Sequence, residues 1–182
     1  MMAIEIIDSD TFLGADTNFN IFTNERETNL NADQRCVESG SFYLGDLVNV
    51  FRTGSMVTRV VDGGLLSHSS TLYGTCDGAI GAVLTLAPEL YRFAHDVQKA
   101  VAGQCRNAMR ISHEVYRAFD KDQIVVPSKG FVDGDLVESL LDMPRETARK
   151  IVQDVLLPNQ EEPVDQNAEN VLKLVEELSR MH

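Results

Sequence analysis

Residues 72–86, LYGTCDGAIGAVLTL, contain the strongest structural signal in the chain. Asp77-Gly78 lies between two apolar runs, and Asp-Gly is a preferred pair for the type I′ turn that joins two antiparallel strands. The second run, Ala79–Leu86, has almost no polar alternation. A strand that is apolar on both faces must be covered on both faces. The stretch therefore predicts a β-hairpin inside a layered antiparallel structure.

The same strand character extends outward over residues 1–86. Short apolar or β-branched runs are separated by turn residues about every ten positions, a spacing typical of all-β sandwiches, barrels and propellers. The run 42–51 is apolar on both faces apart from Asp46 and Asn49, which favours stacked propeller blades over a sandwich. Residues 24–40 are polar and predict a long exposed loop or excursion. The predicted strands are Ile4–Ile7, Thr11–Leu13, Phe19–Thr23, Phe42–Phe51, Met56–Val61, Thr71–Cys76 and Ala79–Leu86.

From Pro88 onward the apolar residues recur with the period of an α-helix. Pro88 suits a first helical turn, and Asp133 and Asn167 can cap later helices. The chain is therefore expected to divide into a β-rich domain at 1–86 and a small helical bundle at 87–182. The apolar stripes are Leu90, Phe93, Ala94, Val97, Val101, Cys105 and Ala108, then Leu136, Val137, Leu140 and Leu141, then Ala148, Ile151, Val152 and Val155, and finally Val171, Leu174, Val175, Leu178 and Met181, with a further short helix around 113–119.

The charge balance bears on the kind of partner. The 182 residues include 16 basic and 28 acidic ones, a formal net charge of −12. An acidic protein repels phosphate groups, which disfavours electrostatic binding to nucleic acid or to an anionic membrane. The three cysteines are scattered and odd in number, which predicts a reducing compartment rather than a disulfide framework.

Motifs that carry chemistry are incomplete in this sequence. His113-Glu114 begins a zinc-binding HExxH, but Arg117 stands where the second histidine is needed. Asp133-Gly134-Asp135 begins like a calcium loop without the remaining ligands, so helix capping explains it better. No GxSxG or SxxK nucleophile signature is present. The sequence predicts no enzyme, no catalytic residue, no metal and no cofactor.

Two polar or reactive residues in the strands need an interpretation. Cys76 flanks the hairpin turn without a nearby histidine to activate it, so we expect a small buried apolar residue there. Asn49 interrupts the apolar run LVNVF. It either satisfies a backbone group at a bulge or strand edge, or is an exposed residue on a binding face.

Six pieces of the chain carry a family resemblance: FLGAD with NFNIF (12–22), LGDLVNVF (44–51), LYGTCDGAIG (72–81), SHEVYRAF (112–119), GFVDGDLVESLLDM (130–143) and VEELSRMH (175–182). In this order they resemble the cleavage-and-polyadenylation-specificity-factor A-subunit family, and the last two favour its DNA-damage and cullin-4 branch. The resemblance implies that residues 1 to about 86 are the last blades of a seven-bladed β-propeller, followed by a helical carboxyl-terminal domain. Family members are much longer, so this chain is expected to be a fragment, a truncated paralogue or a wrongly assigned gene product, and to be poorly soluble alone because blade edges are uncovered.

The function that the resemblance implies is that of an adaptor. Members of this branch link the cullin-4 RING ubiquitin ligase to exchangeable WD40-type substrate receptors, in the nucleus and also in the cytoplasm. Cullin-4 docks on a propeller outside this chain, and a receptor inserts a helical segment against the third propeller. The positions here that match that surface are Leu47, Asn49 and Cys76, with Leu47 replacing an aromatic residue and Cys76 a β-branched one. Direct DNA contact is expected to be weak or indirect.

Two other functions stay open. The splicing and polyadenylation branches of the same family make a nucleic-acid-associated RNA-processing subunit the alternative, although the net charge of −12 argues against it. A hydrolytic enzyme would depend only on isolated His and Asp residues.

Overall fold

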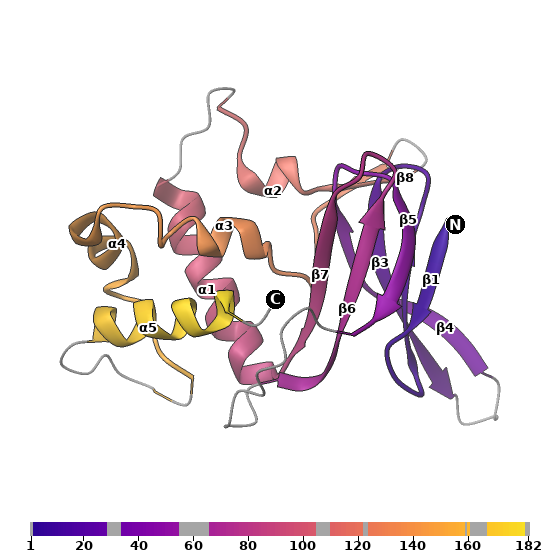
Figure 1. The fold of residues 1–182 in the computed structure, drawn as a ribbon, viewed down its shortest axis with the longest axis horizontal. Coiled ribbons are helices and arrows are strands. Elements are labelled where there is room, and N and C mark those ends of the chain that lie inside the picture. The colour runs from indigo at the N-terminus through magenta and orange to yellow at the C-terminus, as the bar shows by residue number, and fades with distance from the viewer. Residues whose placement is uncertain are drawn as a thin grey trace. The chain divides into compact units, whose positions relative to one another are not determined.

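The computed structural model describes residues 2–28, 34–54, 66–104, 110–121, 124–158, 160 and 167–180 (Figure 1). Its secondary structure is mixed, with antiparallel sheets and α-helices. The chain separates into two compact units. The described residues of the sheet unit fall within Met1–Ser55, Ser69–Leu84 and Ile111–Phe131. Those of the helical unit fall within Met56–His68, Thr85–Arg110 and Val132–His182.

A four-stranded antiparallel sheet forms the first part of the sheet unit. Its strands are β1 (Ala3–Ile6), β2 (Thr11–Ala15), β3 (Asn20–Thr28) and β4 (Gln34–Tyr43), and their order in the sheet is the order in the sequence. Such a meander needs only short turns, and acidic side chains build two of them. The Asp8 carboxylate accepts hydrogen bonds from the backbone N–H groups of Asp10 and Thr11, each at 2.8 Å.

The polar segment 24–40 contains paired strand residues, so the prediction of a loop was wrong for 24–28 and 34–40. Asn24 pairs with Glu38, Arg26 with Cys36 and Thr28 with Gln34, in the long arms of β3 and β4. The side chains of residues 25–27 and 35–38 are exposed. Because neither face of this two-stranded stretch is buried, its sequence lacks the alternation that reveals a strand.

A second sheet has three strands in the order β5 (Val48–Thr53), β6 (Leu66–Thr75) and β7 (Ile80–Leu86). The predicted strand Phe42–Phe51 is not continuous, because β4 ends at Tyr43 and β5 begins at Val48. Gly45 between them has a positive φ of 91°, which a glycine adopts without a steric cost. The predicted strand Met56–Val61 lies outside the described residues.

The two sheets share a hydrophobic core. Leu13 and Ala15 are fully buried, and Phe51 and Val48 are 2% and 1% exposed. Leu13 and Ala15 come from β2, whereas Val48 and Phe51 come from β5, so the core joins the two sheets. Burial of large apolar side chains is the main stabilising contribution available to this unit. The buried members are Leu13, Ala15, Ile21, Phe42, Val48 and Phe51.

Residues 111–131 belong to the sheet unit, although the sequence analysis placed them with the helices. They form α2 (His113–Tyr116), β8 (Phe119–Lys121) and β9 (Ile124–Val126). The N–H of Ser41 donates to the carbonyl of Lys129 at 2.9 Å, and the N–H of Lys129 donates to the carbonyl of Ser41 at 3.0 Å. This segment thereby pairs with the outer edge of β4, which would otherwise present unpaired backbone groups.

The described residues of the helical unit contain the helices α1 (Pro88–Gln104), α3 (Gly134–Glu138), α4 (Arg145–Val152) and α5 (Asn167–Ser179). The side chain of Asp133 caps α3 by accepting from the N–H of Leu136 at 3.4 Å, which confirms the capping prediction. No helix in the described part of the chain is long and apolar enough to cross a membrane. The buried residues of the common core are Leu90, Phe93, Val97, Val101, Val137, Leu140, Ala148, Val152, Val155, Val171 and Val175.

Asn167 does more than begin the last helix. Its side chain is 5% exposed, and its Nδ2 donates to the carbonyl of Val155 at 2.6 Å. A buried carbonyl beyond the end of α4 needs such a partner. The contact ties the segment that follows α4 to the first residue of α5.

Glu169 joins α4 to α5 through ion pairs with Arg145, at 3.1 Å, and with Arg149. The hydrogen bond from Arg149 is the main cause that lowers the pKa of Glu169 below its ordinary value of 4.5. A carboxylate whose pKa is lower in the folded state contributes stability above its unfolded pKa and loses it as the pH falls.

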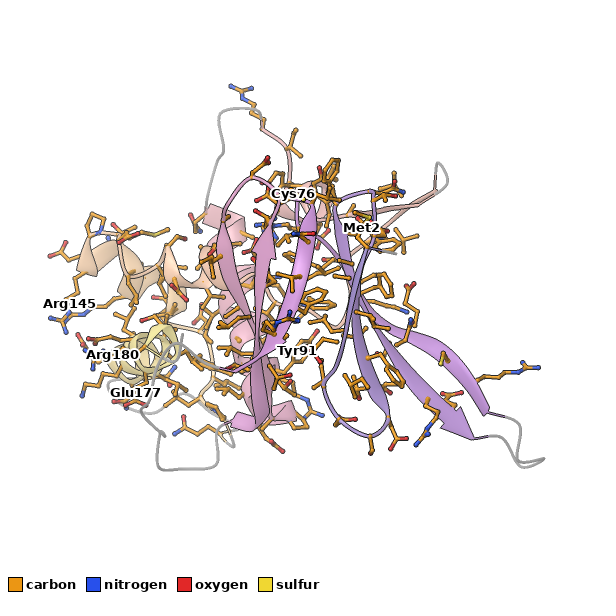
Figure 2. The ribbon with its side chains drawn as sticks, turned by 45° about the vertical axis from the view of Figure 1, so that its right-hand side comes forward. Met2, Cys76, Tyr91, Arg145, Glu177 and Arg180 are labelled. Carbon is orange, nitrogen blue, oxygen red and sulfur yellow. The ribbon has the colours of Figure 1, made fainter. Side chains whose placement is uncertain are left out.

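We therefore expect Glu169→Gln to lower the melting temperature of the helical unit at neutral pH. The difference from the wild type should shrink as the pH falls below the ordinary pKa of 4.5 and disappear once it falls through the lowered pKa of the folded carboxylate. Glu177→Gln, on the exposed side of α5, is the matched control and should show little difference at any pH (Figure 2 labels Glu177). Equal effects of the two substitutions, measured by thermal melts followed by circular dichroism, would contradict the assignment.

Candidate functional site

Leu47, Asn49 and Cys76, here called the docking wall, lie together at one end of the three-stranded sheet. The N–H of Cys76 donates to the carbonyl of Leu47 at 2.9 Å, which extends the β5–β6 ladder by one residue pair. Asn49 follows two residues later, at the start of β5. Asn49 and Cys76 are exposed and Leu47 is partly buried. The structure thus brings together three residues that the sequence separates by up to 29 positions.

The hairpin that carries Cys76 has a three-residue turn, so the predicted type I′ turn was wrong. The N–H of Thr75 donates to the carbonyl of Ala79 at 2.9 Å, and the N–H of Gly78 donates to the carbonyl of Thr75 at 3.2 Å. Type I′ needs a positive φ at both central residues, but of Cys76, Asp77 and Gly78 only Gly78, at 91°, has one. The arrangement is a β-turn over Thr75–Gly78 whose last residue, Gly78, has the left-handed conformation.

The turn also explains why Cys76 is exposed, which corrects the expectation of a buried apolar residue. Cys76 directly follows the buried last residue of β6, Thr75, and its side chain is exposed at the start of the turn. Figure 2 shows it at the end of the sheet. The hydroxyl of Thr75 accepts from the N–H of Ala79 at 3.1 Å and fixes the turn from inside. Cys76 is therefore held at a defined position by backbone bonds.

Asn49 occupies a β-bulge. Val48 pairs with Thr75 and Val50 pairs with Gly74, so Asn49 is the extra residue of β5. A bulge bends the strand and redirects the extra side chain. Asn49 thus lies in a bulge with its side chain exposed, and its role on a binding face stays a prediction.

Arg117 supports the segment that leads into the docking wall, and sequence reasoning missed this role. Its side chain is 8% exposed, and its Nη1 donates to the carbonyls of Tyr43 at 3.2 Å and Leu44 at 3.0 Å. The guanidinium also lies 4.9 Å from the ring centroid of Phe42 and 4.7 Å from that of Tyr116. The HExxR pattern marked this position only as a missing zinc ligand.

The turn between β2 and β3 is joined to the same segment. The carbonyl of Phe19 accepts from the N–H groups of Leu44 at 3.0 Å and Gly45 at 3.1 Å. The Asp16 carboxylate accepts from the backbone N–H groups of Asn18 and Asn20 and from the side chain of Asn20. These hydrogen bonds join the β2–β3 turn to residues 44–45, so the segment that precedes Leu47 is bonded to a neighbouring loop.

Metal-ligating side chains do not gather in the part of the chain that the structure describes, where no group of three or more His, Cys, Asp or Glu residues could hold an ion. Asp133 caps α3, and its own N–H receives a contact from helix α1, donating to Oε1 of Gln98 at 2.6 Å. His113 and Glu114 lie on the four-residue helix α2.

Comparison with known proteins assigns this chain to a family. A family model described as the CPSF A subunit region matches residues 1–142. The chain belongs to the CPSF A subunit family. The resemblance stated from the sequence pieces is thereby confirmed.

Relatives of this CPSF A subunit chain match it from end to end. It is 41% identical over 186 residues to DNA damage-binding protein 1 of Drosophila melanogaster. It is 35% identical over 185 residues to DNA damage-binding protein 1 of Solanum lycopersicum and 33% identical to DNA damage-binding protein 1a of Arabidopsis thaliana. In each case the alignment covers 100% of this chain and 16% of the relative, so the chain spans about a sixth of the length of these proteins.

Proposed function

We propose that this chain is a non-catalytic adaptor segment of a cullin-4 RING ubiquitin ligase and that it serves ubiquitination and DNA repair in the nucleus and cytoplasm. The docking wall of Leu47, Asn49 and Cys76 receives a helical segment of a WD40-type substrate receptor. Cullin-4 itself is bound by parts of the complete protein that lie outside this chain. The similarity to proteins named DNA damage-binding protein 1 supports this assignment.

One structural observation carries the proposal. The hydrogen bond between Cys76 and Leu47 brings a partly buried apolar residue beside an exposed cysteine, and the exposed Asn49 lies two residues further along the same end of the sheet. A preformed surface loses little conformational entropy when a helix docks. Its mixture of apolar contact and one amide suits a helix with an apolar face and a polar margin.

We further infer that the two sheets are blades of a seven-bladed β-propeller and that the helical unit is a small bundle beside it. The four-stranded meander β1–β4 has the strand number and connectivity of one blade. The core between this sheet and β5 fits the packing of neighbouring blades. On this assignment the domains are 1–86 and 87–182, with 111–131 returning to the last blades.

The docking wall is tested in the complete gene product that contains this sequence. Leu47→Asp puts a charge into the expected apolar contact and should weaken receptor binding at least about 30-fold. Asn49→Ala should weaken it about tenfold through loss of one hydrogen bond. Binding is measured with several purified receptors by titration calorimetry.

Val37→Asp is the matched control, because it makes the same chemical change at a side chain 42% exposed on the arm of β4. Its affinity should equal that of the wild type. Circular dichroism must show that all three variants are folded. Unchanged affinity of Leu47→Asp for every receptor would refute the docking wall.

An RNA-processing subunit is the second candidate, because the matching family model is named after a polyadenylation factor. That function predicts RNA binding that falls steeply with rising salt. The same calorimetric series, with single-stranded RNA in place of a receptor at two salt concentrations, separates the two functions.

A further inference from the structure

The described residues of segment 111–131, here called the strap, attach to the outer edge of β4 at two points. At the first point the carbonyl of Arg117 accepts from the N–H of Tyr43 at 3.3 Å, and Nη1 of Arg117 donates to the Tyr43 carbonyl at 3.2 Å. At the second point Lys129 and Ser41 exchange two backbone hydrogen bonds, at 2.9 and 3.0 Å. The strap therefore satisfies backbone groups of β4 that point away from β3.

The second attachment point depends on two glycines. A Cβ added to Gly130, whose φ is 71°, would meet Cα of Gly40 at 3.0 Å and the carbonyl oxygen of Ser39 at 3.1 Å. A Cβ added to Gly40 would meet Cε2 of Phe131 at 3.0 Å and the carbonyl oxygen of Lys129 at 3.2 Å. Carbon atoms prefer separations of about 3.5–4.0 Å. The strap thus approaches β4 this closely because both residues lack a side chain.

This close approach coincides with a β-bulge in β4. Thr23 pairs with Gly40, whereas the next residue of β3 pairs with Glu38, so Ser39 is the extra residue. The hydroxyl of Ser39 donates to Oγ1 of Thr23 at 3.0 Å, and Nζ of Lys129 donates to the carbonyl of Glu38 at 3.2 Å. A bulge bends its strand. The strap therefore binds β4 at the place where the strand changes direction toward its exposed arm.

A short hairpin within the strap connects the two attachment points. Its strands β8 and β9 are antiparallel, and they pair Phe119 with Val126 and Lys121 with Ile124. Phe119 is 5% exposed, which anchors the hairpin in the sheet unit, whereas Val125 is 65% exposed. A hydrogen-bonded ladder fixes its two strands relative to each other, so a displacement at one end of the strap is carried to the other.

We propose that the strap is a conformational device that positions β4, with two attachment points that open and close together as one local unfolding unit. A change at Gly130 then reaches Tyr43 and Leu44, which lead into the docking wall. Two independent attachments would instead open one at a time, each with its own free energy. The proposal concerns how β4 is held and does not depend on the proposed function.

The test compares Gly130→Ala with the wild type by hydrogen exchange and mass spectrometry in the complete protein. The exchange rate should rise about tenfold in the peptide that covers residues 38–41, because the added methyl overlaps its neighbours and alanine disfavours the left-handed conformation. It should rise at least about threefold in the peptide that covers 42–47, although the nearest atoms to the added methyl belong to Ser39 and Gly40. Unchanged exchange in α5 shows that the variant is folded. A rise confined to 38–41 would overturn the proposal.

The reverse experiment uses Arg117→Ala, which acts at the first attachment point. It should also raise the exchange rate in the peptide that covers 38–41, and wild-type exchange there would contradict a single opening unit. Gly130→Asn is the second variant, because asparagine tolerates a positive φ but its Cβ meets the same atoms. It should reproduce most of the effect of Gly130→Ala, whereas wild-type exchange would show that the close approach to Gly40 does not hold the strap.

Gly78→Ala is the matched control. Gly78 also has a positive φ, 91°, but among the described residues nothing beyond its own chain neighbours lies within 4 Å of an added Cβ. The substitution therefore carries the conformational cost without the steric contact, and it should leave both β4 peptides unchanged. Equal rises in this control would overturn the proposal, since a general loss of stability would then explain them. No receptor takes part in these measurements, so a failure here leaves the proposed function unaffected.

Discussion

Phe51→Ala should destabilise the sheet unit by about 3–5 kcal/mol, the range expected when a buried aromatic side chain is truncated to alanine. Phe51 is 2% exposed and packs in the core that the two sheets share. It lies opposite Tyr73 in the β5–β6 ladder. The loss combines the transfer free energy of the ring with the cavity that the close-packed interior cannot fill.

Hydrogen exchange measured by mass spectrometry reports the loss of stability peptide by peptide, so the effect of Phe51→Ala can be measured in the complete protein. The free energy of opening should fall in peptides that cover β2, β3 and β5, and stay unchanged in α5. Phe19→Ala is the matched control, because the same atoms are removed from a side chain that is 43% exposed. Similar losses for both substitutions would show that the core does not depend on Phe51.

The sequence predicted strands and helices correctly where a local pattern of residues coincides with burial of one face. Strand runs ending at turn residues located β1, β2, β7 and the second half of β6, and Pro88 marked the first residue of α1. The apolar stripe Leu90, Phe93, Val97 and Val101 is fully inside the core of the helical unit. In these places the repeat of side chains along one face is the direct cause of the element.

The same rules failed where tertiary contacts decide the structure. The arms of β3 and β4 are paired yet exposed, so no hydrophobic period marks them. The segment 111–131 joins the sheet unit through backbone bonds between Ser41 and Lys129, which are 88 residues apart and carry no side-chain signature. A local pattern cannot report a partner that distant.

The candidate site contains both a feature that the sequence revealed and a feature that it did not. Asn49 stood out because a polar side chain broke an apolar run, and the bulge at that position is the physical reason. The exposure of Cys76 followed from the exact turn type, which depends on which residues adopt a positive φ. The dipeptide Asp77-Gly78 located the hairpin but not the number of residues in its turn.

Arg117→Ala should destabilise the sheet unit by about 3 kcal/mol, because it leaves two carbonyls without their charged donor and removes a buried side chain. Arg117 donates to Tyr43 and Leu44 and lies against the rings of Phe42 and Tyr116. Its backbone carbonyl also accepts from the N–H of Tyr43 at 3.3 Å, a contact that the substitution keeps. Hydrogen exchange should therefore rise most in the peptide that covers residues 42–47.

A matched control and a conservative variant separate burial from charge. Arg52→Ala removes an exposed arginine that also donates to a backbone carbonyl, that of Phe51 at 3.1 Å, and should cost less than about 1 kcal/mol. Arg117→Lys keeps the charge but not the flat guanidinium near the rings of Phe42 and Tyr116, so the stability that it loses should be intermediate. Because Leu44 leads directly into the docking wall, Arg117→Ala should also weaken receptor binding without touching the receptor. Receptor affinity that stays at the wild-type level while exchange in residues 42–47 rises would show that the docking wall is held by the Cys76–Leu47 bond alone.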